Sequence, residues 1–328
     1  MKTAMSTTGM KSPRRLSAGM TLVELMVALA VGSFLVVGSV QVYNQSREAY
    51  VINESIARVQ ETAQFAMDTI EADLRLASHY GRLSRGDAIV GRSISGTANP
   101  RSLTVPVNEV CSSDWALALE RPVDGLNNTY SLGCAPSSGT AQANSDTLTV
   151  RRTSLDPVAF DATRLQIQST RLQGQIIDDG TMPPGYTAGE SETHNLQVNS
   201  YYVDADSALI PGVPTLRRKS LGVLAGVPAV LDLEVAPGVE NLQVQFGVDT
   251  NGDNTVDRYV NPGHAVLGDP ANAIVTARVW VIVRSIGPEI GIVDTTDYEP
   301  GDRDLGVPND EFRRVMLSKT ILLRNARS

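Results

Sequence analysis

Apolar and polar residues follow two different patterns along the first eighty positions. Leu25 to Ser46 is a run of 22 residues without a charged side chain. From Arg47 onward, apolar residues instead recur every three or four positions, which is typical of one face of an amphipathic helix. We therefore expect one long helix from Met20 to about Ser78. Its apolar face lies at Ile52, Ile56, Val59, Ala63, Ala66, Ile70, Leu74 and Ala77.

The two patterns predict different surroundings for the two halves of this helix. At about 1.5 Å per residue, the uncharged run spans roughly 33 Å, enough to cross the hydrocarbon core of a bilayer. We expect residues 20–46 to form a transmembrane half and residues 47–80 to cover a folded domain. Gly81 is the predicted stop signal. The internal Gly32 and Gly38 leave open whether the first half stays helical throughout.

Alternation of apolar and polar residues, as at 242–246, predicts strands in the second half of the chain. No helical pattern separates them, which indicates an antiparallel sheet domain over residues 146–328. The predicted fold class is therefore α+β, a long N-terminal helix packed on an antiparallel sheet. The predicted strands are 147–153, 164–169, 195–203, 215–219, 229–235, 241–248, 255–260, 274–285 and 313–323.

The charge distribution indicates an orientation and excludes one class of partner. Residues 1–19 carry Lys2, Lys11, Arg14 and Arg15 and no acid, so their removal takes the formal net charge from −8 to −12. Basic residues before a span and an acidic body after it are typical of a cytoplasmic N-terminus and an exported C-terminus. We expect no nucleic-acid partner, because phosphate binding needs clustered Lys and Arg.

The junction Gly19-Met20-Thr21-Leu22-Val23-Glu24 resembles the type IV prepilin signal: a basic leader, Gly, then Thr-Leu-x-Glu and an apolar helix. The resemblance implies the pilin fold, cleavage after Gly19 by a prepilin peptidase, and methylation of the Met20 amine. It also implies that Glu24 pairs with the N-terminal ammonium of a neighbouring subunit and sets its register. A carboxylate in a membrane span costs about 2.5–3.5 kcal/mol, so Glu24 needs a partner. The alternative is an ordinary signal anchor with an isolated Glu.

Two later segments are similar to PilW-type minor pilins. One is the predicted helix end at 73–81, a partial match, and the other is 238–249 with the closing strands. This resemblance implies a single-pass inner-membrane protein, periplasmic at its C-terminus, that primes type IV pilus assembly and sits at the pilus tip. The implied partners are other minor pilins, the major pilin and a PilY-type tip adhesin. The alternatives are a type II secretion pseudopilin and a membrane-anchored calcium-dependent adhesin.

Residues 81–145 are rich in Gly, Ser and Asn, with short apolar runs at 103–107 and 115–119, and resemble the connection between helix and sheet in pilins. This connector contains both cysteines, Cys111 and Cys134, with 22 residues between them. An oxidising compartment would let them pair, which would stabilise the fold by about 3 kcal/mol. Two buried free thiols are the alternative.

Residues 249–257 place oxygen-bearing side chains at alternate positions. A hard cation such as Ca²⁺ needs six to eight oxygen ligands, and this spacing resembles the first part of a calcium loop. Asn254 stands where such a loop has Gly, and Val260 where it has a bidentate Glu. The alternative is a polar hairpin turn at Asn251-Gly252. The predicted ligands are Asp249, Asn251, Asp253, Thr255 and Asp257.

Catalytic motifs are missing from the sequence. His79, His194 and His264 are far apart, and the chain has no Gly-x-Ser-x-Gly, His-Glu-x-x-His or phosphate-loop pattern. Acid pairs such as Asp178-Asp179 are typical of solvated turns. We therefore expect no enzymatic activity.

Overall fold

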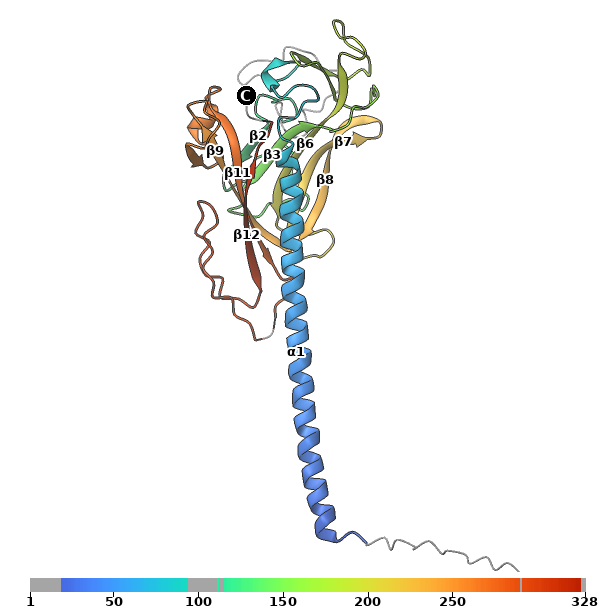
Figure 1. The fold of residues 1–328 in the computed structure, drawn as a ribbon, viewed down its shortest axis with the longest axis vertical. Coiled ribbons are helices and arrows are strands. Elements are labelled where there is room, and N and C mark those ends of the chain that lie inside the picture. Colours follow the sequence, from blue (N-terminus) through green and yellow to red (C-terminus); the bar gives the residue numbers. More distant parts are fainter. Residues whose placement is uncertain (1–18, 94–110, 112–114, 290, 326–328) are drawn as a thin grey trace, which may run out of the picture. The chain divides into compact units, whose positions relative to one another are not determined.

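Two compact units divide the chain, one over Met1–Glu54 and one over Ser55–Ser328. The computed structural model describes residues 19–93, 111, 115–289 and 291–325. The leader up to residue 18 and the predicted apolar run at 103–107 lie outside the described residues. The second unit contains both sheets, which Figure 1 shows around the C-terminal half of the long helix.

One helix, α1, runs over Leu22–Arg75 and belongs to both units. It has 54 residues and continues through Gly32 and Gly38. The prediction is confirmed except at the ends, since the helix begins two residues after Met20 and stops at Arg75 rather than Ser78. Ser78 adopts a left-handed φ of 65°, which ends the helical path before Gly81 is reached.

The first sheet has eight strands and is antiparallel except for one pair. Its long strand β6 pairs with β3, β4 and β7. The parallel pair is β1 with β5. At one edge, β8 pairs only with β7 among the described strands. The strands are β1 (Ile89–Val90), β2 (Val123–Leu126), β3 (Thr147–Thr153), β4 (Gln166–Ser169), β5 (Gly174–Ile177), β6 (Glu192–Asp204), β7 (Thr215–Leu224) and β8 (Val227–Pro237).

The second sheet has four antiparallel strands in the order β10-β9-β11-β12. They are β9 (Val239–Asp249), β10 (Arg258–Val260), β11 (Ala273–Arg284) and β12 (Arg314–Leu322). Gly238 joins the two sheets at a φ of 94°, and a Cβ there would lie 2.9 Å from the Arg284 carbonyl oxygen. Glycine is therefore required where the chain passes from β8 to β9.

The second half of α1 packs its apolar face on both sheets. Val59, Ala63, Ala66, Ile70 and Leu74 are buried in one core with strand residues from each sheet. This confirms the predicted fold class, a helix that covers a sheet. The structure also corrects one detail, because the strands form two sheets, one with a parallel pair, where a single antiparallel sheet was predicted.

A polar residue on the buried side of α1 fixes the helix to the first sheet. Asp73 Oδ1 accepts hydrogen bonds from Arg152 Nε at 2.9 Å and Nη2 at 2.7 Å. Its Oδ2 accepts from Asn199 Nδ2 at 2.7 Å and from the Tyr201 hydroxyl. The Asp73 side chain is only 4% exposed. These partners lie on β3 and β6, so Asp73 sets where α1 sits along the sheet.

The other face of the first sheet is also covered. Along β6, Tyr201 and Val203 face the α1 core, whereas Leu196 and Val198 belong to a second core with Trp115. Residues of the connector therefore form a packed layer, and β2 within it pairs with β3. From the sequence this segment was predicted only as a connection between helix and sheet, because its apolar runs are too short to show a period.

Candidate assembly site at the start of the N-terminal helix

Thr21 and Glu24 close the first turn of α1 on itself. The Thr21 hydroxyl oxygen accepts a hydrogen bond from the Glu24 backbone N–H at 3.2 Å. In return, Glu24 Oε2 accepts from the Thr21 backbone N–H at 2.9 Å and from its hydroxyl at 3.0 Å. This reciprocal arrangement is a capping box, which satisfies donors that the start of a helix leaves unpaired. Glu24 therefore has a local role at the helix start.

This local role was not predicted from the sequence, where Glu24 was expected only to pair with the ammonium of another subunit. The signal was present, since Thr-x-x-Glu directly before an apolar run is the sequence signature of a capping box. The pairing of Glu24 with a neighbour stays a prediction.

The predicted cleavage bond lies just outside the helix. Gly19 and Met20 are both exposed and precede α1, which begins at Leu22. A peptidase needs an accessible segment of chain that is not locked in helical hydrogen bonds. The backbone at Gly19–Met20 meets that requirement. Cleavage and methylation remain predictions at these positions.

The first half of α1 presents an apolar surface. Its side chains from Leu25 to Ser46 carry no charge, and those of the large apolar residues are exposed, as for Phe34 at 82%. Among the described residues, α1 is the helix long and apolar enough to cross a membrane. Such a surface is stable only against lipid or against other apolar helices.

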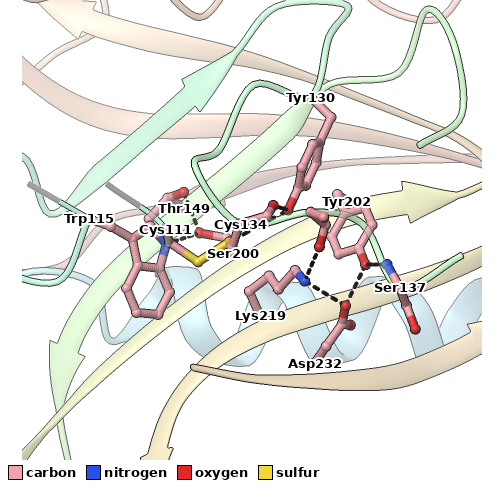
Figure 2. Close-up of a disulfide and its surroundings, with 11 residues drawn as sticks. Cys111, Trp115, Tyr130, Cys134, Ser137, Thr149, Ser200, Tyr202, Lys219 and Asp232 are labelled. Carbon is pink, nitrogen blue, oxygen red and sulfur yellow. Dashed lines mark hydrogen bonds and ion pairs between the residues drawn. A yellow bond between two sulfur atoms is a disulfide. The ribbon is translucent and has the colours of Figure 1, made fainter. Parts of the chain in front are cut away.

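Cys111 and Cys134 form the predicted disulfide. Figure 2 shows it beside side chains that tie the connector to the first sheet. Trp115 Nε1 donates to Ser200 Oγ on β6 at 2.8 Å, and the Tyr130 hydroxyl donates to the Cys134 carbonyl at 2.6 Å. Lys219 on β7 donates to the Ala135 carbonyl at 2.6 Å. The disulfide thus belongs to the packed layer behind the first sheet.

The predicted calcium loop is held by its own hydrogen bonds. Asp249 accepts from the backbone N–H groups of Asn251, Gly252 and Asn254 at 3.0, 2.7 and 2.6 Å. Burial acts to raise the pKa of Asp249, but these N–H groups outweigh it and hold the pKa below its ordinary value. Asp257 accepts from the Thr250 backbone N–H at 2.7 Å.

These hydrogen bonds are sufficient to explain residues 249–257 as a polar turn without a bound cation. No group of three His, Cys, Asp or Glu side chains within the described ranges is arranged to hold a metal ion. A bound cation would have to take over carboxylate oxygens that now accept from the backbone. Calcium binding at Asp249, Asn251, Asp253, Thr255 and Asp257 stays a prediction.

Two family models match this chain, one near its N-terminus and one in its C-terminal part. Residues 14–40 match the prokaryotic N-terminal methylation motif, and this range contains Gly19, Met20 and Glu24. Residues 200–325, from the end of β6 through β12, match type IV pilus-assembly protein W. These two matches support a type IV pilin of the PilW type. The family consists of structural proteins.

The chain also has a relative among solved structures. It is similar to a type IV-like pilin from Thermus thermophilus, at 14% identity, over 59% of this chain and 83% of that chain, with a TM-score of 0.28. The curated proteins contain no match. Its methylation motif and apolar helix indicate membrane anchoring during pilus assembly, where a type IV pilin interacts with other pilus components.

Proposed function

We propose that this PilW-type pilin is a minor subunit that primes type IV pilus assembly and sits at the pilus tip. The observation that carries the proposal is the exposed, uncharged surface of α1 from Leu25 to Ser46, with a single carboxylate at Glu24 before it. In a membrane this surface faces lipid. In a filament core it packs against equivalent helices, so one segment serves both states.

Glu24 then acts as the register contact between subunits. Cleavage after Gly19 would create an ammonium at Met20, and a carboxylate inside an apolar bundle needs such a partner. The capping box holds Glu24 Oε2 against Thr21 in the single chain. On assembly, the carboxylate exchanges part of this local contact for the ammonium of a neighbour.

The globular unit supports a position at the tip. It extends over Ser55–Ser328 and contains two sheets and an added layer. A bulky unit is easier to accommodate at the end of a filament than at every position along its shaft, an argument by analogy with the family. On the same analogy, the partners are other minor pilins, the major pilin and a PilY-type tip adhesin. The leader stays in the cytoplasm and the globular unit lies in the periplasm.

Mass spectrometry of the mature N-terminus, in membrane and sheared-pilus fractions of piliated cells, tests this function. We expect N-methylated Met20 in both fractions. Deletion of the gene should reduce piliation, and the wild-type chain but not the Glu24→Ala variant should restore it. A processed chain that never enters pili would instead indicate a secretion pseudopilin. An intact leader would indicate an anchored adhesin.

A further inference from the structure

The β7–β8 hairpin ends in an apolar tip. Residues 221–231 contain no polar side chain. They form the end of β7, a two-residue turn and the start of β8. Ala225 and Gly226 both have positive φ, 53° and 81°, as a type I′ turn requires. Leu224 and Val227 beside the turn are 62% and 55% exposed.

The backbone of β8 has a free edge. Within the described residues β8 pairs only with β7, in a register that starts with Leu224 opposite Val227. In a two-residue hairpin the closing pair exchanges hydrogen bonds, and hydrogen-bonded pairs then alternate along the ladder. By this alternation Val230, Asp232 and Glu234 point their N–H and C=O groups away from β7. This edge can therefore accept another strand.

The side chains of β8 leave this edge without an unpaired charge. Asp232 accepts from Arg217 Nε at 2.8 Å and lies 2.7 Å from Lys219 Nζ, and Glu234 accepts from Arg217 Nη1 at 3.0 Å. On the opposite face, Leu233 is 41% exposed. It lies two residues before Val235, which packs on the α1 core. The exposed face of β8 is thus neutral and apolar.

Natural sheets protect edges like this one, most often with charged side chains such as Lys. The edge strand β12 of the second sheet follows that rule. Its Lys319 is partly exposed and pairs with Glu71 of α1, and Ser318 and Thr320 are exposed. In β8 the two acids, Asp232 and Glu234, are ion-paired with β7 and only 19% and 9% exposed, and the prolines stand near its two ends, at Pro228 and Pro237. The segment between them has no exposed charge. This difference between the two long edges points to β8 as an interaction surface.

We propose that β8 is a docking edge to which another pilus subunit adds an extended, neutral, apolar strand. Main-chain hydrogen bonds to Val230, Asp232 and Glu234 supply the pairing, and contacts with Leu224, Val227 and Leu233 select an apolar sequence. A second copy of this chain fits less well, because the mature chain carries a net charge of −12. The inference rests on the proposed assembly of this chain with other pilus subunits.

Photo-crosslinking in living cells tests the occupant. A photoreactive amino acid replaces Leu233 in the full-length chain, and the matched control replaces Leu172, which is 86% exposed in the β4–β5 turn. From position 233 we expect a cross-linked peptide in a strand of another protein with a prepilin signal, and none from position 172. Cross-links to lipid, to a second copy, or to the same protein from both positions would overturn the proposal, as would no cross-link at 233.

Edge variants test the consequence for assembly. Val230→Pro removes an outward N–H, and Leu233→Lys adds a charge typical of protected edges. Both should lower the amount of this chain in sheared pili about tenfold. Thermal unfolding and N-terminal processing should match the wild type, and Leu172→Lys should behave as the wild type. If Val230→Pro destabilises the fold, the amount of the Leu233→Lys variant in sheared pili alone tests the proposal.

Two results separate this inference from the proposed function. Normal incorporation of Leu233→Lys, together with lost incorporation of Glu24→Ala, would contradict docking at β8 and leave the proposed function intact. If the wild-type chain itself is absent from pili, the proposed function fails. In that case, cross-links from position 233 in the membrane fraction still decide whether β8 binds another pilin.

Discussion

Glu24 and Asp73 lie near opposite ends of the same helix and have opposite surroundings. Among the described residues, the exposed Glu24 carboxylate is hydrogen-bonded only to Thr21, three residues away. Asp73 is buried, and its partners on β3 and β6 are 79 to 128 residues away. The contacts of Glu24 lie within the helix and do not depend on where the helix packs. Those of Asp73 exist only when the helix is packed on the sheet.

The two halves of α1 therefore obtain their stability from different sources. The first half needs an apolar environment that the chain does not itself provide. The second half finds that environment in its own sheets. An uninterrupted helix can thus combine an assembly surface with a structural element. Substitutions in the two halves should change different measurements.

The largest effect is expected at the buried acid. Asp73→Ala leaves the Arg152 guanidinium partly buried without its carboxylate, and breaking a buried pair in this way costs about 3–5 kcal/mol. Denaturant unfolding of the full-length chain in detergent should show this loss. The control is Asp68→Ala on an exposed side of the helix, which should change the stability by less than about 0.5 kcal/mol. Equal effects at the two positions would contradict the role given to Asp73.

The disulfide should stabilise the domain to a smaller degree, away from α1. Cys134→Ser opens the loop between Cys111 and Cys134, which should lower the free energy of unfolding by about 3 kcal/mol. In a double variant with Asp73→Ala, the two losses of unfolding free energy should add, because the two sites share no contacts. A clearly non-additive result in a double-mutant cycle would show that the connector layer and the helix anchor are coupled.

Glu24→Gln should leave the stability of the globular unit unchanged and reduce incorporation into pili by about tenfold. The reason is that Gln can still accept the Thr21 N–H but cannot pair with an ammonium. Quantitative immunoblots of sheared pili against total membrane protein measure this effect.

A second variant separates the capping role of Glu24 from its charge. Thr21→Val removes the capping hydroxyl and retains the carboxylate, so it should cost the helix about 1 kcal/mol and retain most incorporation. Equal loss of incorporation in both variants would show that the cap, rather than the charge, is what assembly requires.

Calcium should give the smallest effect, and it should leave both halves of α1 unchanged. If the 249–257 loop binds the cation, millimolar calcium should stabilise the full-length chain by about 1 kcal/mol relative to chelator. Asp253→Asn should remove this difference. No shift in the thermal scan between calcium and chelator would establish the loop as a turn held by its own hydrogen bonds.

Long periodic segments were predictable from the sequence. The predicted strand at 147–153 is β3 without change, and the prediction at 274–285 differs from β11 by one residue at each end. The apolar positions from Val59 to Ala77 are buried as the spacing predicts. In each case one face of the element meets a core, so the burial pattern repeats with the period of the backbone.

Short elements and side-chain competition were not predictable. β1, β2 and β5 have two to four residues, too few for a period to show. The predicted strand at 255–260 begins only at Arg258, because the Asp253 carboxylate accepts from the Thr255 backbone N–H and hydroxyl and keeps that segment in the turn. At the candidate site, the prepilin motif identified Glu24 directly. The capping box could have been predicted only by considering Thr21, three residues earlier, together with Glu24.

The first and last elements of the chain close one core together. Leu323 is buried in the core that contains Ala77, Lys319 on β12 pairs with Glu71, and Asn325 donates to the Ala77 carbonyl at 3.3 Å. Part of the apolar face of α1 is therefore covered only once β12 has been made, more than two hundred residues later in the chain. A chain truncated before β12 should leave that part of the helix exposed, and limited proteolysis should then cut it where the wild-type chain resists.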